Sequence, residues 1–199
     1  MLKVGLTGSI AVGKSFVLEI FREFGAFVLD ADLTAREVVA PDTKGWRLII
    51  EQFGSNILLP NNEIDRAKLG AVVFADERKR QLLNFIVHPL VIEAQNLWLL
   101  EREAEQPDGI AVIDAALMIE SGGCRRFDKL IVVWCDDKIQ LQRLMTRSNL
   151  SEEEALKRIN SQMPQAEKKR YADYTIDTSE GFEDTRRQTI EVFEQLKLL

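Results

Sequence analysis

The fold is decided by the stretch Leu2-Lys3-Val4-Gly5-Leu6-Thr7-Gly8-Ser9-Ile10-Ala11-Val12-Gly13-Lys14-Ser15. In it an apolar run leads to Gly8, and an amphipathic helical pattern begins directly after Lys14. The segment between them fits Gly-x-x-x-x-Gly-Lys-Ser, the motif of phosphate-binding loops (P-loops), with Gly13 and Ser15 at the other defined positions. A strand, a glycine loop and a helix in this order favour a phosphate site over a chance Lys-Ser after a turn.

The motif also predicts which groups meet the phosphates. Glycines let the backbone N–H groups approach phosphate oxygens, and the N-terminus of the next helix adds unpaired donors and the positive end of a dipole. Lys14 is expected on the β- and γ-phosphates, and the Ser15 hydroxyl is expected on Mg²⁺. The first fifteen residues therefore predict a site for a nucleoside triphosphate.

Composition excludes several other classes of protein. The 199 residues are 46% hydrophobic and 29% charged, which is typical of a soluble globular protein, and no segment predicts a membrane span or a signal peptide. A net charge of −6 argues against a general binder of nucleic acid or of anionic membranes. Cys124 and Cys135 lack Cys-x-x-Cys spacing, and His88 is the only histidine. We therefore expect reduced thiols, no zinc site and a cytoplasmic location.

Strands and helices alternate along the chain, which predicts a three-layer α/β fold around a parallel sheet. Five strands are expected, at 2–6, 26–30, 110–114, 129–135 and 174–177. About 70 residues of helical pattern separate the second strand from the third, far more than a crossover needs. This insertion predicts a small lobe for a second substrate, with a helix break at His88-Pro89 because proline disfavours helix at the residue before it.

Aspartates follow the second and third predicted strands, at the sheet edge where open α/β sheets bind ligands. Asp30 and Asp32 end the second strand, and either one can cap the next helix or take part in chemistry. Asp114 ends the third strand in the manner of a Walker-B carboxylate, which holds Mg²⁺ directly or through water. The alternative is that Asp114 caps the next turn.

A helix pair after the fourth strand carries several bases. Arg143 and Arg147 lie four residues apart and share one helix face, and a capping box at Ser151 starts the second helix. Further bases follow at 168–170. Guanidinium groups suit phosphate oxygens, so this pair is predicted to be a lid over ATP. In the alternative, Glu152–Glu154 pair with these bases on a solvated face.

Taken together, these motifs resemble the dephospho-coenzyme A kinase family. The resemblance is carried in order by Gly5-Leu6-Thr7-Gly8, Asp30-Ala31-Asp32, His88-Pro89, Asp114-Ala115-Ala116-Leu117-Met118-Ile119-Glu120, Gln142-Arg143 to Arg147, Gln162, and Ala172-Asp173-Tyr174-Thr175-Ile176-Asp177. It implies a P-loop kinase core with a five-stranded parallel sheet, built from residues 1–32, 108–137 and 171–199. It also implies a helical acceptor-binding lobe at about 33–107 and a lid at about 138–170.

The resemblance further implies a reaction. The family moves the γ-phosphoryl group of ATP to the ribose 3′-hydroxyl of dephospho-CoA, with Mg²⁺, in the last step of coenzyme A synthesis. By position it implies catalysis by Asp32 as general base with Lys14, Arg143 and Arg147, and acceptor binding by Asp32, Arg36 and His88. It implies ATP binding by Gly8, Ser9, Ile10, Ala11, Val12, Gly13, Lys14, Ser15 and Phe16. His88 is alternatively a structural hydrogen-bonding group. We expect no nucleic-acid or membrane partner, and a monomer or weak homo-oligomer.

The sequence departs from the family pattern at a few positions, and two other functions compete. The departures are Ser9, Ala11, Val12, Phe16, Ala116 and Thr178. Another small-molecule kinase would share the P-loop and lid but would lack the helical insertion with its His-Pro pair. A GTPase switch would need an Asn-Lys-x-Asp motif to read the base, and no Asn-Lys dipeptide occurs.

Overall fold

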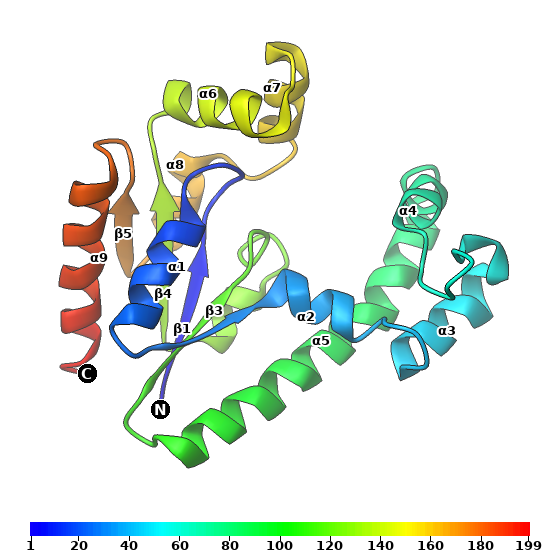
Figure 1. Ribbon diagram of the computed structural model, residues 1–199, viewed down its shortest axis with the longest axis horizontal. Helices are drawn as coiled ribbons and strands as arrows, with labels where there is room; N and C mark the ends of the chain where they lie inside the picture. Colours follow the sequence, from blue (N-terminus) through cyan, green and yellow to red (C-terminus); the bar gives the residue numbers. More distant parts are fainter. The chain divides into compact units, whose positions relative to one another are not determined.

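The computed structural model describes all 199 residues, and it contains a five-stranded sheet with strand order β2-β3-β1-β4-β5 (Figure 1). The strands are β1 (Leu2–Thr7), β2 (Phe27–Asp30), β3 (Ile110–Asp114), β4 (Lys129–Trp134) and β5 (Tyr174–Asp177). β1 pairs in parallel with β3 and with β4, and β4 pairs in parallel with β5. The predicted α/β fold with a five-stranded parallel sheet is confirmed.

Helices connect the strands, and several begin at residues whose side chains cap the first N–H groups. They are α1 (Lys14–Glu23), α2 (Ala31–Glu37), α3 (Lys44–Phe53), α4 (Arg66–Phe74), α5 (Glu77–Glu105), α6 (Asp137–Ser148), α7 (Glu152–Asn160), α8 (Gln165–Lys168) and α9 (Phe182–Leu196). Asp65 caps α4, Asp136 caps α6, and Ser151 forms a capping box with Glu154 at α7. None of the helices is both long and apolar enough to cross a bilayer.

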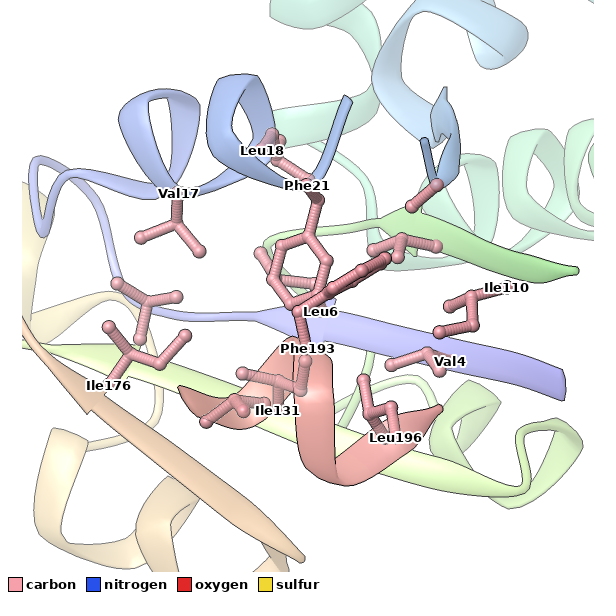
Figure 2. Packing of buried hydrophobic residues seen from close by; sticks show 14 of the residues in the cluster. Val4, Leu6, Val17, Leu18, Phe21, Ile110, Ile131, Ile176, Phe193 and Leu196 are labelled. Carbon is pink, nitrogen blue, oxygen red and sulfur yellow. The ribbon is translucent and has the colours of Figure 1, made fainter. Parts of the chain in front are cut away.

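One face of the sheet is covered by α1 and α9. Phe21 of α1 and Phe193 of α9 are buried there, with ring centroids 6.0 Å apart, against Val4 and Leu6 of β1 (Figure 2). Successive residues of a strand point to opposite faces, so Gly5 faces the other side, where Met118 and Phe127 lie against it. Burying such large apolar side chains stabilises the fold by about 1.5–3 kcal/mol each. The sheet and the two helices thus form a rigid base for the loop that follows β1.

The chain divides into two compact units. The first contains residues 1–29 and 102–199, and the second contains residues 30–101. The second unit has its own apolar core, formed by residues of α3, α4, α5 and the turn between α3 and α4: Ile49, Ile57, Leu69, Val73 and Ile86. The helical insertion between β2 and β3 is therefore able to bury a core of its own.

The predicted helix break at His88-Pro89 is wrong, because α5 runs without interruption from Glu77 to Glu105 with Pro89 inside it. A proline inside a helix cannot donate a hydrogen bond to the carbonyl four residues earlier, and its ring clashes with that carbonyl. Together these effects destabilise the helix by about 3 kcal/mol. That carbonyl belongs to Phe85, an exposed residue on the surface of α5. Burial of Ile86, Gln95 and Leu99 along the same helix offsets this cost.

Gly8, directly after β1, is a position where no side chain fits. A Cβ atom there would overlap the carbonyl oxygen of Val133 in the neighbouring strand and lie 2.9 Å from Val12 Cγ2. We expect Gly8→Ala to lower the free energy of unfolding by about 1–3 kcal/mol, because the backbone must move. Thermal melts should show a Tm several degrees lower, at about 2–4 °C per kcal/mol. The matched control is Gly70→Ala in α4, where the nearest atom to the new Cβ would be 3.8 Å away. The Tm of this control should not fall. A Gly8→Ala protein with the Tm of wild type would contradict the steric argument.

Candidate active site

The P-loop bends sharply to present the start of α1. Gly13 has φ of 90° at the N-cap of α1, and neither a side-chain cap nor an acidic residue uses the first N–H groups of the helix. Ala11 has φ of 62°, which for a residue with a side chain costs about 1–2 kcal/mol. Alanine at position 11 therefore adds local strain to the loop, which glycine at that position would not have. The free N–H groups and the helix dipole favour an anion at this point.

A cavity of about 700 Å³ opens over this loop. It is lined by the P-loop and by one face of α6: Ser9, Ala11, Val12, Gly13, Lys14, Ser15, Phe16, Ile139, Gln142, Arg143, Thr146 and Arg147. The lining has three cationic side chains and no carboxylate, in a chain whose net charge is −6. Lys14 Nζ lies 3.4 Å from the Gly8 carbonyl oxygen, reaching back over the loop. Three positive charges beside a helix N-terminus make this a site for a polyanion such as a triphosphate.

Arg143 is held in place by the segment after β5. Its Nη1 and Nη2 atoms donate to the hydroxyl and the carbonyl of Thr178, both at 2.8 Å, and the Thr178 hydroxyl donates to the Val12 carbonyl at 2.8 Å. A guanidinium has five N–H donors, so the two bonds to Thr178 do not use all of them. The acidic residues of α7 have other partners, since Glu153 pairs with Lys157 and Glu154 caps Ser151. These two glutamates therefore form no ion pair with Arg143, whose guanidinium is bound to Thr178.

A smaller hollow of about 160 Å³ adjoins the first and shares Gly13, Phe16 and Arg143 with it. Its other lining residues are Thr178, Gly181, Phe182 and Thr185. Phe16 and Phe182 meet edge to face with ring centroids 4.8 Å apart, and Phe182 is 75% exposed. An exposed aromatic ring beside a phosphate site offers a surface on which a flat heterocycle can pack. Phe16, predicted by position as an ATP-binding residue, lines both hollows.

The residues predicted to hold Mg²⁺ are Asp114 of β3 and Ser15 of α1, the helix that follows β1. Asp114 is the last residue of β3 and is in register with Leu6 of β1, while Ser15 lies in the first turn of α1 and lines the cavity. A hydroxyl and a carboxylate are hard oxygen donors, which suit a cation that shares its ligands with phosphates and water. No group of three or more His, Cys, Asp or Glu residues forms an all-protein metal site. The donor set therefore fits Mg²⁺ that arrives with a nucleotide.

The residues predicted to bind the acceptor all lie in the second compact unit. Asp32 and Arg36 are on α2, and His88 is on α5. Asp30 is the N-cap of α2, where its carboxylate accepts from the N–H groups of Asp32 and Leu33 at 2.8 and 3.1 Å. Capping is therefore the role that the geometry gives Asp30. Asp32 and Arg36 follow one turn apart on α2. His88 lines a shallow hollow of about 450 Å³ along α5.

Two buried polar residues of the first unit, Gln140 and Lys168, have roles that no sequence motif predicts. Gln140 is 1% exposed, and its side chain donates a hydrogen bond to the Ile10 carbonyl of the P-loop. The sequence predicts a role only for the arginines of this helix. Lys168, counted from the sequence among the lid bases, is fully buried, with its ammonium 2.9 Å from Glu120 and 2.7 Å from the Ala116 carbonyl oxygen. The available signal was the spacing of Gln140 and buried Leu144 on one helix face.

Comparisons with known proteins agree with this geometry. The model of the dephospho-CoA kinase family matches residues 2–184. A dephospho-CoA kinase of Geobacillus kaustophilus is 48% identical over 196 residues, covering 98% of this chain and 96% of that protein. The crystal structure of TT1252 from Thermus thermophilus has a TM-score of 0.82 at 26% identity, and a dephospho-CoA kinase from Campylobacter jejuni has a TM-score of 0.73 at 28% identity. Each structural match covers 98% of this chain and 96% of the other. The P-loop, the arginine-bearing helix and a family match of this extent lead to one conclusion: the chain belongs to the dephospho-CoA kinase family.

Proposed function

We propose that this chain transfers the γ-phosphoryl group of ATP to the ribose 3′-hydroxyl of dephospho-CoA, giving coenzyme A and ADP in the last step of coenzyme A synthesis. The observation that carries the proposal is the cavity with three cationic side chains over the P-loop, in a chain of this family. Family membership supports the choice of acceptor, and the cavity supports the choice of donor. The chain is accordingly an ATP-dependent phosphotransferase with an alcohol as acceptor.

In the proposed site the P-loop and Lys14 bind the β- and γ-phosphates of ATP. The N–H groups at the start of α1 stabilise the phosphate oxygens, and Arg143 and Arg147 of α6 neutralise the charge that develops on the transferring group. We assign the adenine to the hollow beside Phe16 and Phe182, since it adjoins the phosphate cavity and offers an exposed ring. Residues at about 138–170 act as the lid, which excludes water from the reaction when it covers the donor.

On the acceptor side, we assign the general base to Asp32 in the first turn of α2, two residues after β2. The 3′-hydroxyl oxygen forms a bond to the γ-phosphorus while the bond from that phosphorus to the bridging oxygen breaks, so ADP leaves. The proton of the hydroxyl passes to the Asp32 carboxylate. Most of the rate acceleration comes from positioning and charge neutralisation. Arg36 and His88 are proposed contacts of dephospho-CoA in a helical lobe at about 33–107.

Mg²⁺ is part of this proposal, with the Ser15 hydroxyl and the Asp114 carboxylate holding it directly or through water. When bound, the ion supplies positive charge that offsets the negative charge of the phosphate oxygens. A cytoplasmic location also belongs to the proposal, because Cys124 and Cys135 are both free thiols and burial raises the pKa of the Cys135 thiol, which disfavours its reactive thiolate. A monomer or weak homo-oligomer stays our expectation.

The proposed function is tested by an ADP-release assay that offers dephospho-CoA, adenosine monophosphate and shikimate as separate acceptors, each with ATP and magnesium chloride. We expect turnover with dephospho-CoA and none above the ATP-hydrolysis background with the other two. Turnover with one of those acceptors and none with dephospho-CoA would replace this proposal with another small-molecule kinase. Preferential binding of GTP without transfer to any acceptor would favour a GTPase instead.

The two arginines of α6 should respond differently to removal. Arg147→Ala is expected to lower kcat by about 10²–10³ with little change in Tm, because only contacts with the transferring phosphoryl group are lost. Arg143→Ala should lower kcat similarly and also lower Tm, because its two hydrogen bonds to Thr178 are worth about 1.5–3 kcal/mol each at most. Steady-state kinetics and thermal melts measure both, with Arg22→Ala in the exposed last turn of α1 as the control. Equal melting temperatures for both variants would argue against a structural role for Arg143.

A further inference from the structure

The peptide of Ile10 in the middle of the P-loop is held on both sides by glutamine side chains. Its N–H donates to Gln162 Oε1 at 2.7 Å, and its carbonyl accepts from Gln140 Nε2 at 2.8 Å. Gln140 lies on α6, and Gln162 follows α7. Neither glutamine lines the phosphate cavity, so any effect that they have on ATP is indirect.

These hydrogen bonds extend to the end of β4 through a third glutamine. Gln140 Oε1 accepts from Gln165 Nε2 at 2.9 Å. Gln165 in turn accepts from the Cys135 N–H and donates to the Cys135 carbonyl, both at 3.1 Å. Gln140 is 1% exposed, so its amide has little water to replace these partners. The part of this connection that Gln140 makes is therefore shielded from solvent.

The next residue explains why such a connection is useful. Ala11 adopts a left-handed backbone conformation, with φ of 62°, that residues other than glycine adopt reluctantly. A loop with alanine at this position would relax to another conformation unless its neighbours were held. Ile10 is that neighbour, and both of its backbone groups are bound to glutamines.

We propose that Gln140 and Gln162 are positioning residues of the ATP site, which hold Ile10 so that Ala11 keeps the conformation needed for phosphate binding. α6 carries both Gln140 and Arg143, one turn apart, so the same helix positions the loop and supplies a cation to the cavity. A displacement of α6 therefore alters two parts of the donor site together. The inference rests on the proposed binding of ATP at this loop.

The test compares Gln162→Met, Ala11→Gly and the double variant with wild type in the full-length protein. ATP dissociation constants are measured by calorimetry with magnesium chloride, alongside KM for dephospho-CoA and Tm. We expect Gln162→Met to raise the ATP dissociation constant about tenfold, as one lost hydrogen bond predicts, with KM for dephospho-CoA within about twofold of wild type. Ala11→Gly in the same chain should restore most of the affinity, because glycine adopts the bend without support. Gln195→Met on the exposed side of α9 is the matched control.

Three results would overturn the inference. Unchanged ATP affinity in Gln162→Met is the first, and equal losses for ATP and dephospho-CoA with a lower Tm are the second, because they indicate a merely structural role. The third is rapid hydrogen exchange of the Ile10 amide of wild type without ATP, a measurement that stands even where Gln162→Met fails to fold. Failure of wild type to bind ATP would instead reject the proposed function, so the two failures are distinguishable.

Discussion

Replacing Lys14 by alanine is expected to lower kcat/KM for ATP by about 10²–10³, the range for loss of one preorganised group that stabilises charge in a transition state. The ammonium group is one of three cations in the cavity, so the variant should also bind ATP more weakly. The fold should be unaffected, because the contact of Lys14 Nζ with the Gly8 carbonyl is long, at 3.4 Å. Steady-state kinetics, calorimetry and thermal melts measure the three quantities.

Two further variants make this result specific. Lys14→Arg keeps the charge but replaces a compact ammonium with a planar fork, so it should recover only part of the activity. Lys197→Ala, on the surface near the end of α9, removes a lysine remote from the cavity and should behave like wild type. A Lys14→Ala enzyme with normal turnover and normal ATP affinity would reject the assignment of the P-loop.

The second large effect is expected for Asp32→Asn. Asparagine has nearly the same size but cannot take up the hydroxyl proton, so kcat should fall by about 10²–10⁴. ATP affinity should stay close to that of wild type, because we assign phosphate binding to the P-loop and not to Asp32. The two substitutions thus separate donor binding from proton transfer: Lys14→Ala impairs both turnover and ATP binding, while Asp32→Asn impairs turnover alone.

Asp30→Asn is the matched control for Asp32→Asn, because the two aspartates are two residues apart. Asn caps a helix about as well as Asp, so α2 should remain capped and turnover should be close to that of wild type. Near-normal turnover of Asp32→Asn would remove it as the base. A loss confined to Asp30→Asn would transfer that role to Asp30.

Most of the fold was predictable because its signals are local. β3 and β5 have the bounds that the sequence predicts, and the caps at Asp65, Asp136 and Ser151 lie within a few residues of the N–H groups that they bind. The wrong prediction of a helix break at Pro89 also came from a local signal. A local penalty of about 3 kcal/mol was outweighed by packing along a helix of 29 residues, which a single dipeptide cannot reveal.

Only the residues of the candidate site that belong to sequence motifs could be predicted. Lys14, Ser15 and the arginines of α6 stand in motifs, so their shared cavity could be expected. Gln140 and Lys168 could not, because each binds a partner far away in the sequence: Gln140 binds Ile10, and Lys168 binds Glu120. Polar residues of this kind were visible only as exceptions to the apolar face of a helix, and a sequence does not state which distant backbone group satisfies them.

The unbalanced charge of the phosphate cavity has a consequence for selectivity. Three cations without a carboxylate attract any triphosphate, whatever its base or sugar, and inorganic polyphosphates as well. Discrimination among nucleotides must therefore arise outside the phosphate cavity, and we propose the ring surface of Phe16 and Phe182 for this role. With a net charge of −6, the rest of the chain repels anions, and at physiological salt this repulsion fades beyond about 8 Å. In a cell, polyanions other than ATP should enter this cavity often and dissociate quickly. Selectivity for ATP therefore depends on which complex lasts long enough to react.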